Sequence, residues 1–144
     1  MPSERAGVVS SSVSRESSSD PRTNEPCVLI IDDDPQVAHV TRFILKRSGF
    51  HAITASTPEE GLHLAIELRP DVIICDGALP RISGPEVLRI LKSTPETATT
   101  PVIIMSGHEG LDYQGLFTFL KKPFDAATLI GATRNALAMR MQPA

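Results

Sequence analysis

Short apolar runs alternate with amphipathic stretches from residue 27 toward the end of the chain. The apolar runs cover residues 27–31, 51–54, 71–75, 102–106 and 116–120. Continuous runs of this length, without strict apolar–polar alternation, are typical of strands that are buried on both faces. Five such strands with helices between them predict an α/β fold, in which a parallel sheet is covered on both sides.

Apolar residues at intervals of three and four predict the helices that connect the strands. The expected apolar faces consist of Val37, Val40 and Ile44 in the first helix, Leu62, Ala65 and Ile66 in the second, Val87, Ile90 and Leu91 in the third, and Ala126, Ile130, Leu137 and Met141 in the last. The stretch GHEGLDYQG at residues 107–115 has three glycines in nine residues. A turn or a shortened, irregular fourth helix is therefore expected there.

Capping residues mark where several of these helices begin. Asp34 stands before a proline and is expected to cap the first helix. Thr57 is followed by a proline and, three residues on, by Glu60, which predicts a capping box for the second helix. The third helix is expected from about Pro85 and the last from about Asp125, which serves as a cap.

Residues 1–26 differ in composition from the rest of the chain. Eight of the first twenty residues are serine, mixed with proline and with charges of both signs. Such a segment buries too little apolar surface to offset the entropy of ordering, so a disordered tail is expected. A phosphoregulated or docking tail is the alternative interpretation.

Composition and charge exclude several classes of protein. The net charge of −3 does not indicate a nucleic-acid-binding or polybasic membrane surface, and no apolar run is long enough for a membrane span. The two cysteines, Cys27 and Cys75, lack the spacing of a metal cluster and are expected to be small buried residues. A reducing compartment, the cytoplasm, is therefore the expected location.

Polar side chains follow the predicted strands at their carboxyl ends. Asp32 and Asp33 follow the first strand, Asp76 ends the third, Ser106 ends the fourth, and Lys122 ends the fifth. Ligands of open α/β sheets bind at this edge, so these groups are expected to share one cleft. Each residue taken alone has an ordinary explanation as a cap, a turn residue or a surface charge.

Carboxylates that gather in a cleft repel one another unless a cation balances them. Mg²⁺ suits such a site because it takes hard oxygen ligands from one or two carboxylates, from water and from phosphate oxygens. A hydroxyl and an ammonium group are suited to hold the remaining oxygens of a phosphoryl group. The set of residues thus favours phosphoryl transfer onto a carboxylate.

Taken together, these residues make the sequence resemble the receiver domain of two-component response regulators. The resemblance covers residues 27–142 and is carried by four segments in order: VLIIDDDP at 28–35, PDVIICDGALPRISG at 70–84, TPVIIMSG at 100–107 and FLKKPFD at 119–125. It implies a flavodoxin-like three-layer sandwich with a five-stranded parallel sheet of order 2-1-3-4-5.

The resemblance also implies a role for each matching residue. Asp76 would be the phosphoacceptor, and Mg²⁺ would be held by Asp32, Asp33, Asp76 and the backbone carbonyl of Ala78. Ser106 and Lys122 would hold the phosphoryl oxygens, with a cis peptide bond between Lys122 and Pro123. Ser106 and Phe119 would form the conformational switch.

The function implied by the resemblance is signalling. A histidine kinase or a histidine phosphotransfer protein would supply the phosphoryl group, and an unknown protein would receive the signal. The domain would catalyse only its own phosphorylation and dephosphorylation. It would bind neither nucleic acid nor a membrane.

One region departs from the family pattern. Only fifteen residues separate Ser106 from Lys122, which shortens the fourth helix and places the usual dimerisation surface in doubt. His108 in this stretch either positions water near the phosphoryl group or is an exposed loop residue. With nothing following the last helix, the chain is interpreted either as a stand-alone receiver or as part of a longer regulator.

Two alternative functions are open at this stage. The first is a pseudo-receiver of the same fold that binds a partner without being phosphorylated. The second is a Mg²⁺-dependent phosphatase that resembles the haloacid dehalogenase family, with residues 32–34 as its paired aspartates. The phosphatase interpretation leaves Asp76 without a role, and Gln36 departs from its motif.

Overall fold

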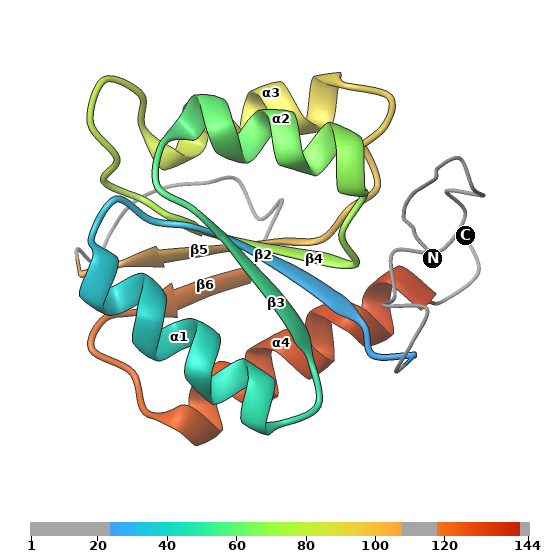
Figure 1. Ribbon diagram of the computed structural model, residues 1–144. Coiled ribbons are helices and arrows are strands. Elements are labelled where there is room, and N and C mark those ends of the chain that lie inside the picture. The colour runs from blue at the N-terminus through green and yellow to red at the C-terminus, as the bar shows by residue number, and fades with distance from the viewer. Residues whose placement is uncertain (1–23, 108–117, 142–144) are drawn as a thin grey trace, which may run out of the picture.

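The computed structural model describes residues 24–107 and 118–141, which form a parallel sheet between two layers of helices (Figure 1). The strands are β2 (Cys27–Ile31), β3 (His51–Ala55), β4 (Val72–Asp76), β5 (Val102–Ser106) and β6 (Thr118–Lys121). Their order in the sheet is β3-β2-β4-β5-β6. Counted along the chain, this is the expected order 2-1-3-4-5, so the flavodoxin-like fold is confirmed.

The helices of the described residues are α1 (Pro35–Arg47), α2 (Pro58–Leu68), α3 (Gly84–Ser93) and α4 (Ala126–Met141). In Figure 1, α2 and α3 lie on one face of the sheet, while α1 and α4 lie on the other. None of these helices is long and apolar enough to cross a membrane.

Strand β2 contributes to the hydrophobic clusters on both faces of the sheet, because successive side chains of a strand point to opposite faces. Leu29 and Ile31 join the cluster beneath α2 and α3, whereas Val28 and Ile30 join the cluster beneath α1 and α4. All five residues of β2 are buried. Burial on both faces explains why the sequence shows an uninterrupted apolar run here.

The helix faces differ in part from the sequence prediction. In α1 the buried residues are Ala38, Thr41 and Leu45, and the predicted core residue Val40 is 54% exposed. The other predicted face residues that prove exposed are Ile66, Ile90 and Ala126. Small residues occupy many of the contact positions, because a helix that lies close to a sheet has little room for large side chains.

The last helix shows the same effect. Its fully buried side chains are Leu129, Thr133 and Ala136, while the predicted Ile130 and Leu137 are only partly buried. The Thr133 hydroxyl donates a hydrogen bond to the carbonyl oxygen of Leu129 at 2.8 Å, so a polar residue is tolerated against the sheet.

The predicted N-caps Asp34, Thr57 and Asp125 are confirmed, because each side chain accepts a hydrogen bond from a backbone N–H of its helix. The capping box predicted at Thr57 is incomplete, since the Glu60 carboxylate accepts from the N–H of Ser56, one residue further back. A complete capping box occurs instead in α3, which begins at Gly84, one residue before the predicted start.

Several predictions lie outside the described residues. They concern the tail up to residue 23, the irregular fourth helix, the role of His108, the strand residues 116–117, and residue 142.

The end of the predicted tail, residues 24–26, is described, and there the N–H of His51 donates a hydrogen bond to the carbonyl of Pro26 at 2.8 Å. Cys27 and Cys75 are both buried, as expected.

Gly61 allows α2 to lie against the sheet. A Cβ atom at this position would come within 2.6 Å of Cδ1 and 2.7 Å of Cγ1 of Ile31, which is fully buried in β2. Gly131 in α4 has no atom within 4 Å of the corresponding point. The two glycines therefore differ in the space around them, although both lie within helices.

We predict opposite effects for alanine at these two positions. Gly131→Ala should raise the free energy of unfolding by about 0.5–1 kcal/mol, because alanine favours a helix over glycine. Gly61→Ala should lower the free energy of unfolding by about 1–3 kcal/mol, because the added methyl group would overpack the core beneath α2. Urea unfolding of both variants measures the difference, and a stabilised Gly61→Ala protein would contradict the packing argument.

Candidate functional site

The carboxyl ends of four neighbouring strands bring the predicted site residues together. Asp32 directly follows β2, Asp76 is the last residue of β4, Ser106 is the last residue of β5, and Lys122 directly follows β6. The N–H of Lys122 donates to the carbonyl oxygen of Ser106 at 2.8 Å, which continues the pairing of β5 and β6 into the site. The Lys122–Pro123 peptide bond is cis, as expected.

The ammonium group of Lys122 lies near two carboxylates. Its Nζ atom is 3.4 Å from Oδ1 of Asp76 and 3.7 Å from Oδ2 of Asp32. Asp32 and Asp76 are 1% and 7% exposed, so water screens this interaction less than it screens a surface ion pair. One cation thus offsets part of the repulsion between two buried acids.

The surroundings of Asp32 show that Lys122 does not fully offset the negative charge of the two acids. One of its oxygens, Oδ1, accepts a hydrogen bond from the N–H of Asp34 at 2.9 Å. The other, Oδ2, is buried and has no hydrogen-bond partner among the described residues. Burial raises the pKa of this carboxyl, and the charges of Asp76 and Asp33 add to the increase, although the Asp34 N–H and Lys122 oppose it. The ionised form of Asp32 is therefore less favourable here than in water, and a further cation would offset this cost.

The residues present fit a divalent cation. Asp32, Asp33 and Asp76 each offer a carboxylate oxygen, and these three atoms lie within 4.8 Å of one another. Asp33 is exposed, whereas Asp32 and Asp76 are buried, so the cluster opens to solvent on one side. Hard oxygen donors with an open side suit Mg²⁺, which retains several waters when bound. The orphaned Oδ2 atom of Asp32 adds a buried lone pair that such an ion would satisfy.

The segment after Asp76 is held closely against α3. The N–H of Ala78 donates to Oδ1 of Asp76 at 3.2 Å, and the N–H of Gly84 donates to the carbonyl of Gly77 at 3.1 Å. A Cβ atom on Gly84 would lie 2.8 Å from Cα of Gly77. Sequence reasoning did not single out these two glycines, although glycine directly after the candidate acceptor was a usable signal.

The remaining predicted residues lie at or near this edge. Ser106 is 3% exposed and ends β5 beside the cluster. Phe119 pairs in register with Ile104 and is 38% exposed, on the outer strand of the sheet. Ala78 is exposed two residues beyond Asp76. The switch role of Ser106 and Phe119 and the metal-binding role of the Ala78 carbonyl stay predictions.

A largely apolar groove runs from the site along one face of α1. Its lining includes Val37, Val40 and Ile44 on α1, together with Lys122 and Phe124 from the segment after β6. The groove therefore joins an exposed apolar helix face to the ammonium group of the site.

The fold and the site together define a class of α/β domain with an acidic, lysine-containing pocket at the switch point of a parallel sheet. The model of the response regulator receiver domain family matches residues 28–134. The chain belongs to this family, and it is a receiver domain of the response regulators of two-component signalling. Family membership does not favour the phosphatase alternative.

Two relatives illustrate the similarity in sequence. The transcriptional regulatory protein KdpE of Mycobacterium tuberculosis is 37% identical over 76% of this chain and 50% of its own length. The DNA-binding dual master transcriptional regulator RpaA of Synechocystis sp. is 32% identical over 78% of this chain and 49% of its own length. The chain thus spans about half the length of these relatives.

Solved receiver domains show the same fold. One from Clostridium thermocellum has a TM-score of 0.72 at 35% identity and covers 78% of this chain and 94% of its own. The receiver domain of a Francisella response regulator has a TM-score of 0.71 at 28% identity. The match covers 79% of this chain and 98% of the Francisella domain.

We predict that Mg²⁺ stabilises the protein through Asp33. At ten times its dissociation constant, Mg²⁺ should add about 1.4 kcal/mol to the free energy of unfolding. Asp33→Asn should lose most of this gain. The matched control is Asp34→Asn, which removes the same charge one residue away and keeps a good N-cap.

Urea unfolding with MgCl₂, compared with NaCl at equal ionic strength, measures the effect in each protein. Equal stabilisation of the wild type and Asp33→Asn would show that the ion does not bind this cluster.

Proposed function

We propose that Asp76 accepts a phosphoryl group from a phosphohistidine of a partner protein and that the resulting acyl phosphate switches the domain between two conformations. The observation that carries the proposal is the position of the Lys122 ammonium, 3.4 Å from Asp76 and 3.7 Å from Asp32, at the open edge of the sheet. Family membership supports the same assignment.

In the proposed transfer, an Asp76 carboxylate oxygen forms a bond to phosphorus while the bond between phosphorus and the histidine nitrogen breaks. The hydrogen bond from the Ala78 N–H to Oδ1 of Asp76 fixes the orientation of this carboxylate. Lys122 offsets the negative charge of the phosphoryl oxygens, and Ser106 donates a hydrogen bond to one of them. Positioning and charge stabilisation do most of the catalytic work in reactions of this kind.

The proposed metal ligands are Asp32, Asp33, Asp76 and the backbone carbonyl of Ala78. A bound Mg²⁺ would neutralise charge on the transferring group and on the carboxylates. The protein residues themselves orient the acceptor and keep one side of the cluster open through the exposed Asp33.

The proposed switch uses Ser106 and Phe119. Movement of the Ser106 hydroxyl toward the phosphoryl group would free space near β5, and Phe119, which pairs with Ile104 of that strand, would turn inward. Phosphorylation would thereby shift a two-state equilibrium that a downstream protein reads.

The proposed donor is a histidine kinase or a histidine phosphotransfer protein. The relatives include hybrid signal transduction histidine kinase D of Dictyostelium discoideum, which is 26% identical over 81% of this chain. The apolar groove beside Lys122 would receive part of the donor as it presents its histidine. The two buried cysteines, which lack the spacing of a disulfide framework, accord with a cytoplasmic location for this exchange.

The first experiment is intact-mass spectrometry after incubation with acetyl phosphate and Mg²⁺. We expect one added phosphoryl group in the wild type, no adduct without Mg²⁺, and none in Asp76→Asn. Absence of an adduct in the wild type, together with no response to beryllofluoride, would contradict the proposal and favour a pseudo-receiver. An adduct that persists in Asp76→Asn would place the acceptor elsewhere.

A second prediction concerns Lys122. Lys122→Met should slow adduct formation by about 10²-fold or more, because a preorganised cation at the reacting group is removed. Lys121→Met is the matched control, since Lys121 is exposed and precedes the site. Initial rates from mass spectra should stay within about twofold of the wild type in the control, and equal rates in both variants would remove Lys122 from the mechanism.

A further inference from the structure

Helix α1 has an uneven charge distribution that the phosphorylation site does not use. The helix contains Arg42, Lys46 and Arg47, together with His39, and has no acidic residue. The chain as a whole has a net charge of −3. Positive charge is therefore concentrated on one element of an otherwise acidic protein.

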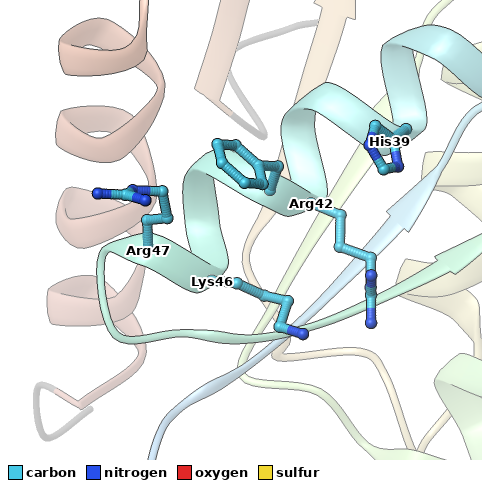
Figure 2. Close-up of a pocket in the computed structure, with 5 residues that line it drawn as sticks. His39, Arg42, Lys46 and Arg47 are labelled. Atoms are coloured by element: carbon cyan, nitrogen blue, oxygen red, sulfur yellow. The ribbon is translucent and has the colours of Figure 1, made fainter.

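These side chains surround a shallow hollow on the outer surface of α1. His39, Arg42, Phe43, Lys46 and Arg47 line it, and we call these five residues the α1 patch. Figure 2 shows Arg42 and Lys46 on one flank of the helix and Arg47 on the other. The patch thus spans the exposed width of the helix.

The patch has an apolar residue at its centre. Phe43 is 54% exposed, and the guanidinium carbon of Arg47 lies 5.7 Å from the centroid of its ring. Exposed aromatic rings flanked by arginine are enriched at the energetic centres of protein interfaces. The arrangement offers an apolar anchor and positive charges at its rim.

The positive charges of the patch have no carboxylate partner among the described residues. In the described part of the chain, no carboxylate forms a salt bridge with Arg42, Lys46 or Arg47. Arg42 donates through Nε to the carbonyl of Ala52, which fixes its position and leaves its charge unneutralised. The patch is therefore ready to receive carboxylates from another molecule.

The patch lies away from the phosphorylation edge. Asp34 caps the helix end near the site, whereas Lys46 and Arg47 are in the last turn. At 1.5 Å per residue, the last turn is roughly 16 Å along the helix from its start. A molecule bound there need not reach Asp76.

We propose that the α1 patch docks a short acidic segment of a partner protein, with an apolar side chain of that segment on Phe43 and its carboxylates on Lys46 and Arg47. Charge complementarity and the aromatic anchor support a protein partner. A nucleic acid or an anionic membrane fits less well, because its extended charge would run from one helix onto a surface of net negative charge. This inference is independent of the proposed phosphorylation.

The test begins with a phage-displayed library of random twelve-residue peptides, selected on the full chain. We expect the enriched peptides to carry an excess of Asp and Glu together with at least one large apolar residue. Enrichment without this composition would overturn the proposal.

Variants then locate the binding site of an enriched peptide by fluorescence anisotropy. Lys46→Gln with Arg47→Gln should weaken binding by about tenfold or more, and Phe43→Ala by about fivefold or more. The matched control is Arg69→Gln with Arg89→Gln, which removes two exposed positive charges from the opposite side of the sheet. Binding in this control should stay within about twofold, and an equal loss in both double variants would overturn the docking site.

Two further measurements complete the test. The urea unfolding transition of the Lys46→Gln, Arg47→Gln protein should match that of the wild type, and this result shows that the variant is folded. A DNA duplex and vesicles of anionic phospholipid are titrated in parallel. Tighter, patch-dependent binding of either one than of the peptides would replace a protein partner with that ligand and overturn the proposal.

Discussion

The site depends on the two ion pairs that the ammonium group of Lys122 forms with Asp32 and Asp76. Parallel strands end at one edge, so the fold itself brings Asp32 and Asp76 together and forces two buried negative charges into proximity. Lys122 offsets part of this repulsion from the end of β6. The remaining negative charge still favours a further cation, and Oδ2 of Asp32 has no hydrogen bond among the described residues. The proposed metal ion and phosphoryl chemistry both follow from this imbalance.

Close backbone packing holds these charges in place. Gly61 brings α2 against β2, the strand that leads into Asp32. Gly77 and Gly84 bring the segment after Asp76 against the start of α3. Side chains at these positions would displace the strand ends that carry the carboxylates. The acidic cluster therefore rests on contacts made at a distance from the reacting atoms.

Helix α1 presents two surfaces of different chemistry. Val37, Val40 and Ile44 line the groove beside Lys122, where the phosphoryl donor is proposed to dock. On another face of the helix, the α1 patch carries positive charge around Phe43. Because the two surfaces lie on different faces of one helix, one partner could be held while another exchanges the phosphoryl group. The receiver domain would then serve as an assembly point as well as a switch.

The sequence alone determined the strands and the residues at their carboxyl ends, because buried parallel strands appear as continuous apolar runs and ligands bind where they end. The order of the strands was expected only from the resemblance to receiver domains. The sequence did not determine which helix residues face the sheet: Val40 is exposed, while Ala38 and Thr41 are buried. Periodicity identifies the apolar residues of a helix. The short distance between helix and sheet, however, leaves room only for small residues at the positions in contact with the sheet. The role of Gly61 and the pairing of Lys122 with two acids were likewise decided only by the tertiary structure, since each depends on distances between segments far apart in the chain. The same is true of the Asp32 oxygen that is buried without a hydrogen bond among the described residues.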